Sequence, residues 1–178
     1  MNNNLIITIG REYGTGGREI GQKLALRLGV PFYDRELITR AAKKTGFDEK
    51  LFEQLDKRAT NSFLYSLTMF GSVGLNGMSL TDQLYLAQSN IIREMAEDSS
   101  CVIVGRCADH VLRDFPNKFD FFIHGSIEDR VKRVQTCGDY VIEGKTPEAA
   151  LEKMDKQRST YYNYYTGKVW GKCDHYYL

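Results

Sequence analysis

The spacing of apolar residues near the N-terminus predicts a strand followed by a helix. Leu5–Ile9 is a short run rich in β-branched residues, which is typical of a strand buried on both sides. After Gly17 the apolar residues recur every four positions, at Ile20, Leu24 and Leu28. This spacing indicates one apolar face of a helix, which we expect to face the core and to end at Gly29.

Further strands follow at regular intervals along the chain. They are predicted at Val30–Tyr33, Cys101–Val104 and Phe119–Ile123, and His175–Leu178 has the composition of the start of a last strand. Strands that alternate with helices predict an α/β fold with a mostly parallel sheet and helices on both faces. In such sheets ligands bind at the carboxyl ends of the strands, where Gly10, Asp34 and Arg106 are expected to lie.

The helices between these strands differ in how clearly the pattern marks them. They are predicted over residues 35–44 and 48–59, from near Thr81, over Ile127–Thr136, and from Pro147 past Arg158. The inward positions are expected to be Leu84, Ala87, Ile91 and Met95 in the third helix, and Ile127, Val131 and Val134 in the fourth. Ser126 with Asp129 resembles a capping box, and Thr146-Pro147 is a typical helix start.

Residues 60–80 show neither the apolar spacing of a helix nor that of a strand. Glycine and serine are interleaved there with large apolar residues, which suits a mobile flap or an oligomer contact better than a core element. No repeat or linker divides the chain, so we expect a single domain over residues 1–178.

Charge and cysteine content narrow the class of protein. The 178 residues carry a formal net charge of +1, so the overall charge does not favour a polyanion such as nucleic acid. The four cysteines, at 101, 107, 137 and 173, lack the spacing of a metal site and are too sparse for a disulfide scaffold. No apolar run is long enough to span a membrane, and the N-terminus lacks a signal-peptide pattern, so a cytoplasmic protein is expected.

The main chemical feature is a glycine-rich segment between the first strand and the first helix. Gly10 to Gly21 contains Gly14, Gly16 and Gly17 within four residues. Glycines let backbone N–H groups approach a phosphate closely, and a helix N-terminus adds partial positive charge. A plain tight turn needs only one glycine, so the segment indicates a phosphate-binding loop.

This loop departs from the usual P-loop sequence at two positions. Gly17 stands where lysine is expected, and Glu19 stands where serine or threonine is expected. Arg11 or Arg18 is a candidate for the missing charge, and Thr15 is a candidate for the missing hydroxyl.

Three segments together resemble the cytidylate kinase-like family. They are the loop from Ile6 to Ile20, the segment Pro31–Asp34, and the segment Val102–Asp109. The resemblance covers nearly the whole chain. It implies a three-layer P-loop NTPase fold of the nucleoside monophosphate kinase type. That fold has about five parallel strands, an acceptor-site flap at 60–80 and a lid at about 146–172.

The resemblance also implies site residues. The loop residues that would bind ATP are Gly10, Arg11, Gly14, Thr15, Gly16, Gly17, Arg18 and Glu19. Asp34 and Arg40 have the family's spacing for contacts to the acceptor phosphate, although a capping Asp and a solvent Arg are equally consistent. Arg106 matches the arginine of a strand-end Asp-Gly-Arg-Asp motif whose two carboxylates are absent here, and a contact to the acceptor phosphate is favoured over a structural ion pair. Asp109 is a candidate replacement for one of the carboxylates, although a surface position on a helix is equally consistent.

In the lid region Asp155 and Arg158 resemble residues that close over the phosphates. The family's further arginines are replaced by Tyr161–Tyr165, whose rings would stack on a base, pack inside the chain or contact another subunit; packing is favoured. Trp170 is expected to anchor this segment.

The resemblance implies a kinase that uses ATP and Mg²⁺ to phosphorylate a nucleoside monophosphate such as CMP. Arg18, Arg106 and Arg158 are the expected catalytic residues, and the metal ligands are not identified. The alternative is a nucleotide-binding regulatory protein with weak or no turnover. In that case the tyrosine-rich segment would form a homo-oligomer contact.

Overall fold

The computed structural model describes residues 3–34, 37, 40, 44, 80–138, 140 and 146–177. Its strands are β1 (Ile6–Arg11), β2 (Phe32–Tyr33), β3 (Cys101–Val104) and β4 (Lys118–Ile123). Its helices are α1 (Gly17–Leu28), α5 (Leu80–Asp98), α6 (Ala108–Val111), α7 (Ile127–Thr136) and α8 (Pro147–Thr166), with a 3-10 turn at Cys173–His175. The helices predicted over 35–44 and 48–59 and the proposed flap lie outside the described residues, apart from Leu37, Arg40, Lys44 and Leu80.

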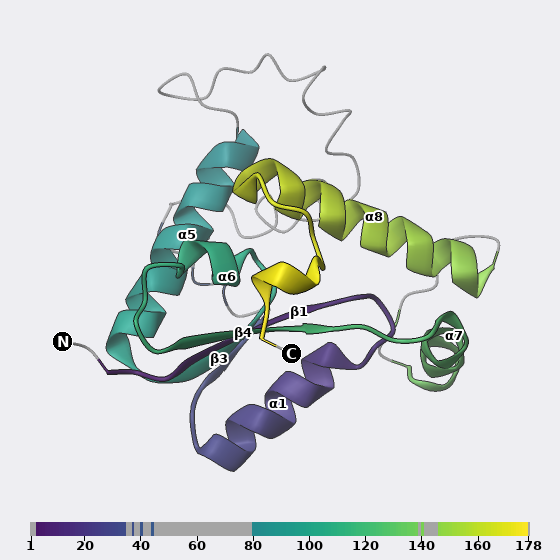
Figure 1. Cartoon of the computed structure of the whole chain (residues 1–178), viewed down its shortest axis with the longest axis horizontal. Coiled ribbons are helices and arrows are strands. Elements are labelled where there is room, and N and C mark those ends of the chain that lie inside the picture. The colour runs from purple at the N-terminus through teal and green to yellow at the C-terminus, as the bar shows by residue number, and fades with distance from the viewer. Residues whose placement is uncertain are drawn as a thin grey trace.

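The described strands form one parallel sheet in the order β2-β3-β1-β4. Figure 1 shows α1 on one face of this sheet and α5 on the other, which is the predicted α/β architecture. Successive residues of β1 and β3 point to opposite faces of the sheet. Ile6, Cys101 and Ile103 pack in the core cluster that includes α5, whereas Ile7, Ile9, Val102 and Val104 pack in the cluster that includes Ala25 of α1.

Helix α1 begins and ends as predicted, but its predicted apolar face is only partly buried, since of its three residues only Leu24 packs against the core. Ile20 and Leu28 are each 43% exposed, and the buried positions are Gly17, Gly21 and Ala25. The reason is the close approach of helix and sheet: a Cβ on Gly21 would lie 2.8 Å from Cγ2 of Val104. A face of small residues lets the backbone of α1 pack against β3, and this close packing brings the helix N-terminus to the strand ends.

The other helices agree with the pattern except at one position. In α5 the residues Leu84, Ile91 and Met95 are buried as predicted. The Ser126 hydroxyl accepts from the Asp129 N–H at 3.1 Å, and the Thr146 hydroxyl accepts from the Ala149 N–H at 3.2 Å, so both predicted helix starts are confirmed.

Ile127 was predicted to face inward and is instead 43% exposed. It lies in the first turn of α7, and the buried positions of that helix are Arg130 and Val134. A buried arginine therefore occupies the inward face where the pattern predicted an apolar side chain.

The described sheet has four strands, one fewer than the five expected. The segment expected to start a last strand makes one backbone hydrogen bond to the sheet: the Tyr177 N–H donates to the Asp120 carbonyl of β4 at 2.7 Å. The same segment passes between α8 and the sheet in Figure 1, so it closes one side of the strand ends.

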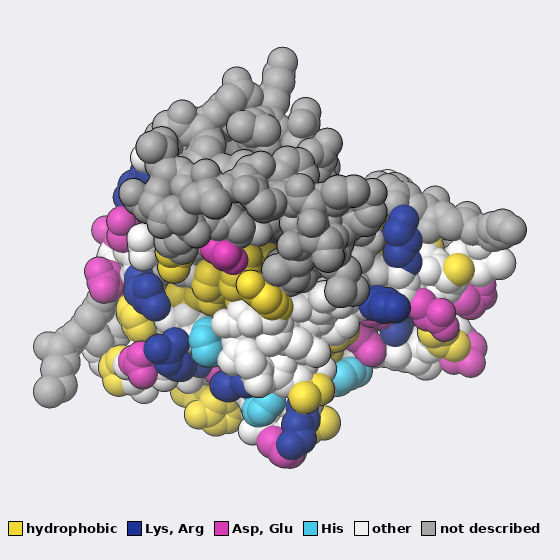
Figure 2. All heavy atoms as spheres, turned by 90° about the horizontal axis from the view of Figure 1, so that it is seen from above, with side chains coloured by type: hydrophobic (Ala, Val, Ile, Leu, Met, Phe, Trp, Pro, Cys, Tyr) yellow, Lys and Arg dark blue, Asp and Glu magenta, His cyan; other side chains and the backbone are white. Residues whose placement is uncertain are grey.

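Figure 2 shows basic and acidic side chains interspersed among the described residues of one face. All four cysteines are free thiols. Among the described residues, no helix has the length and apolar content needed to cross a membrane.

Candidate functional site

The glycine-rich loop encloses a cavity of about 420 Å³, here called the loop cavity. Gly14 and Gly16 adopt positive φ angles of 82° and 77°, which glycine adopts without strain. Gly16 is the N-cap of α1, and no side chain caps the helix there. The first N–H groups of α1 therefore face the cavity, which is the usual arrangement for binding an anion. The cavity is lined by Arg11, Glu12, Tyr13, Gly14, Gly16, Gly17, Arg18, Glu19, Gln22, Arg133, Cys137, Tyr140 and Arg158.

Residues of α7 and α8 hold this loop in place. Arg130 is only 6% exposed, and its Nε–H donates to the Tyr13 carbonyl at 2.7 Å. Asp155 accepts from the Tyr13 N–H at 2.7 Å and forms an ion pair with Arg130. Burial raises the pKa of Asp155, and the Tyr13 and Arg130 contacts oppose that rise. Both polar groups of the Tyr13 backbone are thus satisfied by side chains from elsewhere in the chain.

A second cavity, of about 230 Å³, lies at the carboxyl ends of β1 and β3, and is here called the strand-end cavity. Its floor is the turn after β3, where Gly105, Arg106 and Cys107 have φ angles of 78°, 60° and 56°. Arginine and cysteine rarely adopt this left-handed conformation, and such strain is concentrated at functional sites. The lining residues are Thr8, Ile9, Gly10, Arg11, Asp34, Gly105, Arg106, Cys107, Asp109, Met154, Arg158, Tyr161, Tyr162, Trp170 and Tyr176.

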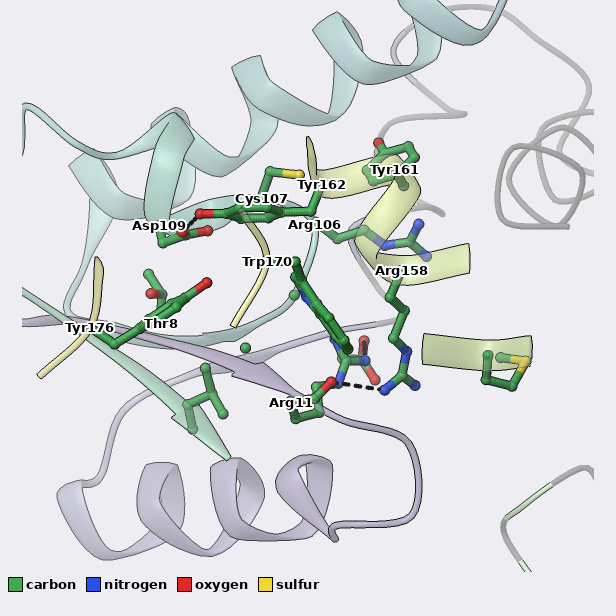
Figure 3. A pocket seen from close by; sticks show the side chains of 15 residues that line it. Thr8, Arg11, Arg106, Cys107, Asp109, Arg158, Tyr161, Tyr162, Trp170 and Tyr176 are labelled. Atoms are coloured by element: carbon green, nitrogen blue, oxygen red, sulfur yellow. Dashed lines mark hydrogen bonds and ion pairs between the residues drawn. The ribbon is translucent and has the colours of Figure 1, made fainter. Parts of the chain in front are cut away.

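Two arginines line both cavities. Arg11, at the end of β1, and Arg158, from α8, lie where the cavities adjoin. The Arg158 Nη1 donates to the Arg11 carbonyl at 3.0 Å, and its guanidinium lies 5.2 Å from the centre of the Tyr13 ring. In Figure 3 these two side chains and Arg106 lie toward one side of the strand-end cavity.

These cations strongly influence one another. Burial and the nearby Arg158 lower the pKa of Arg11 to about 9; Asp34 opposes this, whereas Arg106 and Arg18 add to it. Asp34 accepts from the Arg18 Nε at 2.9 Å and lies 3.9 Å from an Arg11 nitrogen. Burial likewise lowers the pKa of Arg158. Buried guanidinium groups that lie close together repel one another, so this arrangement favours binding of an anion such as a phosphate.

The far side of the strand-end cavity is polar and partly aromatic. The Tyr162 hydroxyl donates to the Asp109 carboxylate at 2.5 Å. Burial raises the pKa of Asp109, and the Tyr162 hydrogen bond opposes that rise. The Trp170 ring packs edge-on against Phe122 at 5.0 Å, and the Trp170 backbone N–H donates to the Asn163 side-chain oxygen at 2.9 Å. Trp170 therefore anchors its segment, as predicted.

The sequence of this chain matches one protein family over most of its length. The model of the cytidylate kinase-like family matches residues 6–178. The chain belongs to the cytidylate kinase-like family. A solved structure of an uncharacterized protein from Eubacterium ventriosum ATCC 27560 is 32% identical, with 97% of this chain and 86% of that chain covered and a TM-score of 0.67.

A shikimate kinase from Bacteroides thetaiotaomicron shares the fold at 16% identity. The match covers 89% of this chain and 82% of that chain, with a TM-score of 0.52. No curated protein matches the chain. The membership and these likenesses give the chain a nucleotide-binding, kinase-like P-loop fold.

In this cytidylate kinase-like chain most of the loop residues expected to bind ATP line the loop cavity. They are Arg11, Gly14, Gly16, Gly17, Arg18 and Glu19. Gly10 lines the strand-end cavity instead, and a Cβ there would lie 2.6 Å from Phe122. Thr15 lines neither cavity, because its hydroxyl donates to the Glu12 carbonyl at 2.9 Å.

The residues expected to bind the acceptor are divided. Asp34, Arg106 and Asp109 line the strand-end cavity. Arg40 is exposed, and its guanidinium lies 5.6 Å from the centre of the Tyr33 ring. Asp155 lies against the loop rather than in either cavity, because its two oxygens contact the Tyr13 N–H and Arg130.

The described residues do not fit a protein-held Mg²⁺ of the usual P-loop kind. The carboxylate at the serine or threonine position, Glu19, is engaged with Lys23 and Arg133, and the Thr15 hydroxyl donates to the Glu12 carbonyl. No cluster of three or more His, Cys, Asp or Glu side chains suited to a metal occurs within the described ranges. Magnesium held mainly by nucleotide phosphates and water needs no such cluster.

Two arginines of α7 were missed by the sequence analysis. Arg130 holds the loop, and Arg133 lines the loop cavity. Their spacing of three places them on one face of the helix, but an arginine on an amphipathic helix usually faces solvent. One sequence feature pointed to these two arginines: both follow the capped start of a helix that comes directly after the end of a strand.

Proposed function

We propose that this chain is an ATP-dependent phosphotransferase. It transfers the γ-phosphoryl group of ATP to a nucleoside monophosphate such as CMP. The observation that supports this function is the pair Arg11 and Arg158, which lines two adjoining cavities at once. One cavity carries the phosphate-binding loop, and the other lies at the strand ends where acceptors bind in α/β folds.

In this proposal ATP binds in the loop cavity. Its phosphates accept hydrogen bonds from the uncapped N–H groups at the start of α1, beside Gly14 and Gly16. Arg130 and Asp155 fix the loop so that these donors are already in position. Preorganised donors stabilise developing charge because they need no rearrangement during the reaction.

The acceptor binds in the strand-end cavity with its phosphate on the arginine side. Arg106 projects from the turn after β3 and Asp34 orients Arg18 and Arg11. The neutral part of the acceptor would lie among the aromatic residues, where Asp109 and Tyr162 offer polar partners. An acceptor-phosphate oxygen then attacks the γ-phosphorus of ATP, the bond from that phosphorus to the β-bridging oxygen breaks, and ADP leaves.

Arg11 and Arg158 lie where the transferred group would pass. Their guanidinium groups would neutralise charge on the phosphoryl group, and this role is typical of arginines in phosphoryl transfer. Arg158 belongs to α8, within the lid-like region 146–172 of the single domain that we propose for 1–178. Closure of that region would exclude water from the transferred phosphoryl group.

The alternative function is nucleotide binding with little turnover, and the observation that favours it is the loop sequence. Gly17 and Glu19 replace the lysine and the hydroxyl residue of active P-loops. The homo-oligomer contact that this alternative assigns to the tyrosine-rich segment receives less support, because much of that segment packs within the chain. The Tyr165 ring stacks on Tyr85 at 3.9 Å, and the Tyr162 hydroxyl is bonded to Asp109.

A coupled assay distinguishes these functions. Purified full-length chain is mixed with ATP, Mg²⁺ and each nucleoside monophosphate in turn, and ADP formation is followed. We expect ADP formation above the ATPase background with at least one nucleoside monophosphate, and CMP is among those tested. A chain that ATP stabilises against thermal unfolding but that turns over none of them would contradict the enzyme and leave the binding protein.

A further inference from the structure

The loop lacks a cation of its own at the position where P-loops carry a lysine. Gly17 occupies that position, and the lysine normally reaches the β- and γ-phosphates. The two arginines nearest in sequence are directed elsewhere. Arg18 donates to Asp34 at 2.9 Å, and an Arg11 nitrogen would lie 2.1 Å from a Cβ on Gly105. Both residues line the loop cavity, but the Arg18 Nε is engaged by Asp34 and the Arg11 guanidinium lies against the turn after β3.

Arg133 of α7 lies directly on the loop. Helix α7 lies beside the segment that joins β1 to α1 in Figure 1. A Cβ on Gly16 would lie 2.6 Å from Cζ of Arg133, 2.8 Å from its Nη2 and 2.9 Å from its Nε. The guanidinium thus covers the Cα of Gly16, and only glycine leaves room for it. Arg133 also lines the loop cavity.

The donors of Arg133 are only partly used. Its Nε is buried and has no hydrogen-bond partner within the described part of the chain. A buried donor without an acceptor is costly, and an anion at the loop would satisfy it. A hydrogen bond to Tyr140 raises the pKa of Arg133. One terminal nitrogen forms an ion pair with Glu19, whose carboxylate is 47% exposed and also pairs with Lys23. Glu19 therefore occupies one guanidinium donor with a negative charge at the start of α1.

We infer that Arg133 replaces the missing loop lysine as a ligand of the donor phosphates. This inference rests on the proposed function, because it requires a nucleoside triphosphate in the loop cavity. The phosphate accepts from Nε and displaces the Glu19 carboxylate, which remains paired with Lys23. The cation reaches the loop from α7, so loop and helix together form a site that the loop sequence does not contain. A guanidinium fork binds a phosphate through two parallel hydrogen bonds, which a single lysine does not provide.

The test measures nucleotide affinity by calorimetry in buffer with EDTA, so that Mg²⁺ does not mask the effect of Glu19. The variants are Arg133→Ala, Arg133→Lys and Glu19→Gln, and Lys132→Ala is the control because it is exposed on the same helix. Each is tested against ATP and AMP, and thermal unfolding without ligand verifies that the variant is folded.

We expect Arg133→Ala to weaken ATP binding by about tenfold or more, the effect of losing a charge-assisted hydrogen bond. AMP binding should change much less, Arg133→Lys should recover part of the loss, and Lys132→Ala should bind as wild type. Glu19→Gln should tighten ATP binding, because it removes the competing charge.

Three outcomes separate the failures. If wild type binds ATP and Arg133→Ala binds it equally well, the role of Arg133 is wrong and the proposed function stands. If Arg133→Ala weakens ATP and AMP alike and lysine recovers nothing, Arg133 only supports the fold of the loop, and the inference is also wrong. If folded wild type does not bind ATP in EDTA, the series is repeated with Mg²⁺, and a wild type that binds ATP under neither condition means that the proposed function itself is wrong.

Discussion

The loop cavity and the strand-end cavity bring positive charge to a ligand in different ways. In the loop cavity the backbone contributes N–H groups, and Arg133 is held by the Glu19 carboxylate. Arg130, which pairs with Asp155, lies outside the cavity and holds the loop. In the strand-end cavity a strained turn fixes Arg106, and one carboxylate, Asp34, contacts both Arg11 and Arg18. The loop side thus combines backbone N–H groups with carboxylate-paired arginines, whereas the strand-end cavity gathers Arg11, Arg106 and Arg158 toward one side.

This difference suggests how the two sides would respond to ligands. A triphosphate in the loop cavity would replace an internal carboxylate, so its net electrostatic gain is reduced. An anion in the strand-end cavity would relieve repulsion among Arg11, Arg106 and Arg158, which, after burial, contributes to the lowered pKa of Arg11. Arg11 and Arg158 take part in both sides, so changes there should affect donor and acceptor together.

The largest effect is expected from Arg158→Ala, which removes a cation from both cavities. We expect kcat to fall by about 10²- to 10³-fold, as when one donor that stabilises transition-state charge is lost. Arg158→Lys should recover only part of the rate, because it keeps the charge and loses the fork. Initial rates over a range of ATP and CMP concentrations measure this. A kcat within threefold of wild type would contradict the proposed role of Arg158 in phosphoryl transfer.

Asp155→Asn tests the carboxylate pairing on the loop side. It removes one of the two carboxylates paired with the buried Arg130, since Glu12 stays 3.5 Å away, and we expect the free energy of unfolding to fall by about 2 kcal/mol, as when a hydrogen bond to a charged group is lost. Urea unfolding measures this, with Glu152→Gln on the exposed face of the same helix as the control. An equal, small effect of both substitutions would mean that the Asp155–Arg130 pair contributes little.

Gly16→Ala separates backbone strain from site chemistry. A positive φ costs a non-glycine residue about 1–2 kcal/mol, and Gly29→Ala has the same cost because its φ is 65°. A Cβ on Gly29 meets nothing within 4 Å, whereas a Cβ on Gly16 displaces Arg133. Both variants should lose similar stability, but only Gly16→Ala should lose the rise in Tm that ATP produces. Loss of that rise in both variants would contradict a local effect at the loop.

The smallest effect is a pH dependence on the strand-end side. Burial raises the pKa of Asp109 above its unfolded value, so its ionisation opposes folding as the pH rises through that interval. Asp109→Asn should therefore gain stability relative to wild type with increasing pH, by at most about 1.4 kcal/mol per pH unit for one proton, and the gain should then level off. Tm values from pH 4.5 to 8 measure it. Asp114→Asn, at an exposed site, should show no such trend.

Part of this site could be predicted from the sequence, because it is formed by residues that are close together in the chain. The cluster of Gly14, Gly16 and Gly17 between a strand and a helix predicts the loop, and Arg106 after the apolar run Cys101–Val104 predicts a cation at a strand end. The structure brings the loop and Arg106 to adjoining cavities, as expected from parallel strands.

The rest depends on contacts between distant residues. Arg133 lies on Gly16 from more than a hundred positions away in the chain, and Asp155 contacts Tyr13 across a separation of 142. No local period marks such pairs. The buried face of α1 was predicted only in part for a related reason, since the pattern weighs large apolar side chains and overlooks the close packing that Gly21 and Ala25 allow.

The most direct test of two adjoining cavities is whether donor and acceptor bind together. Calorimetry with a non-hydrolysable ATP analogue is carried out with and without saturating CMP, and the reverse titration follows. The account predicts that both ligands bind the chain at the same time and that Arg158→Ala weakens both. Mutual displacement of the two ligands, or no binding of CMP to a chain that binds the analogue, would contradict it.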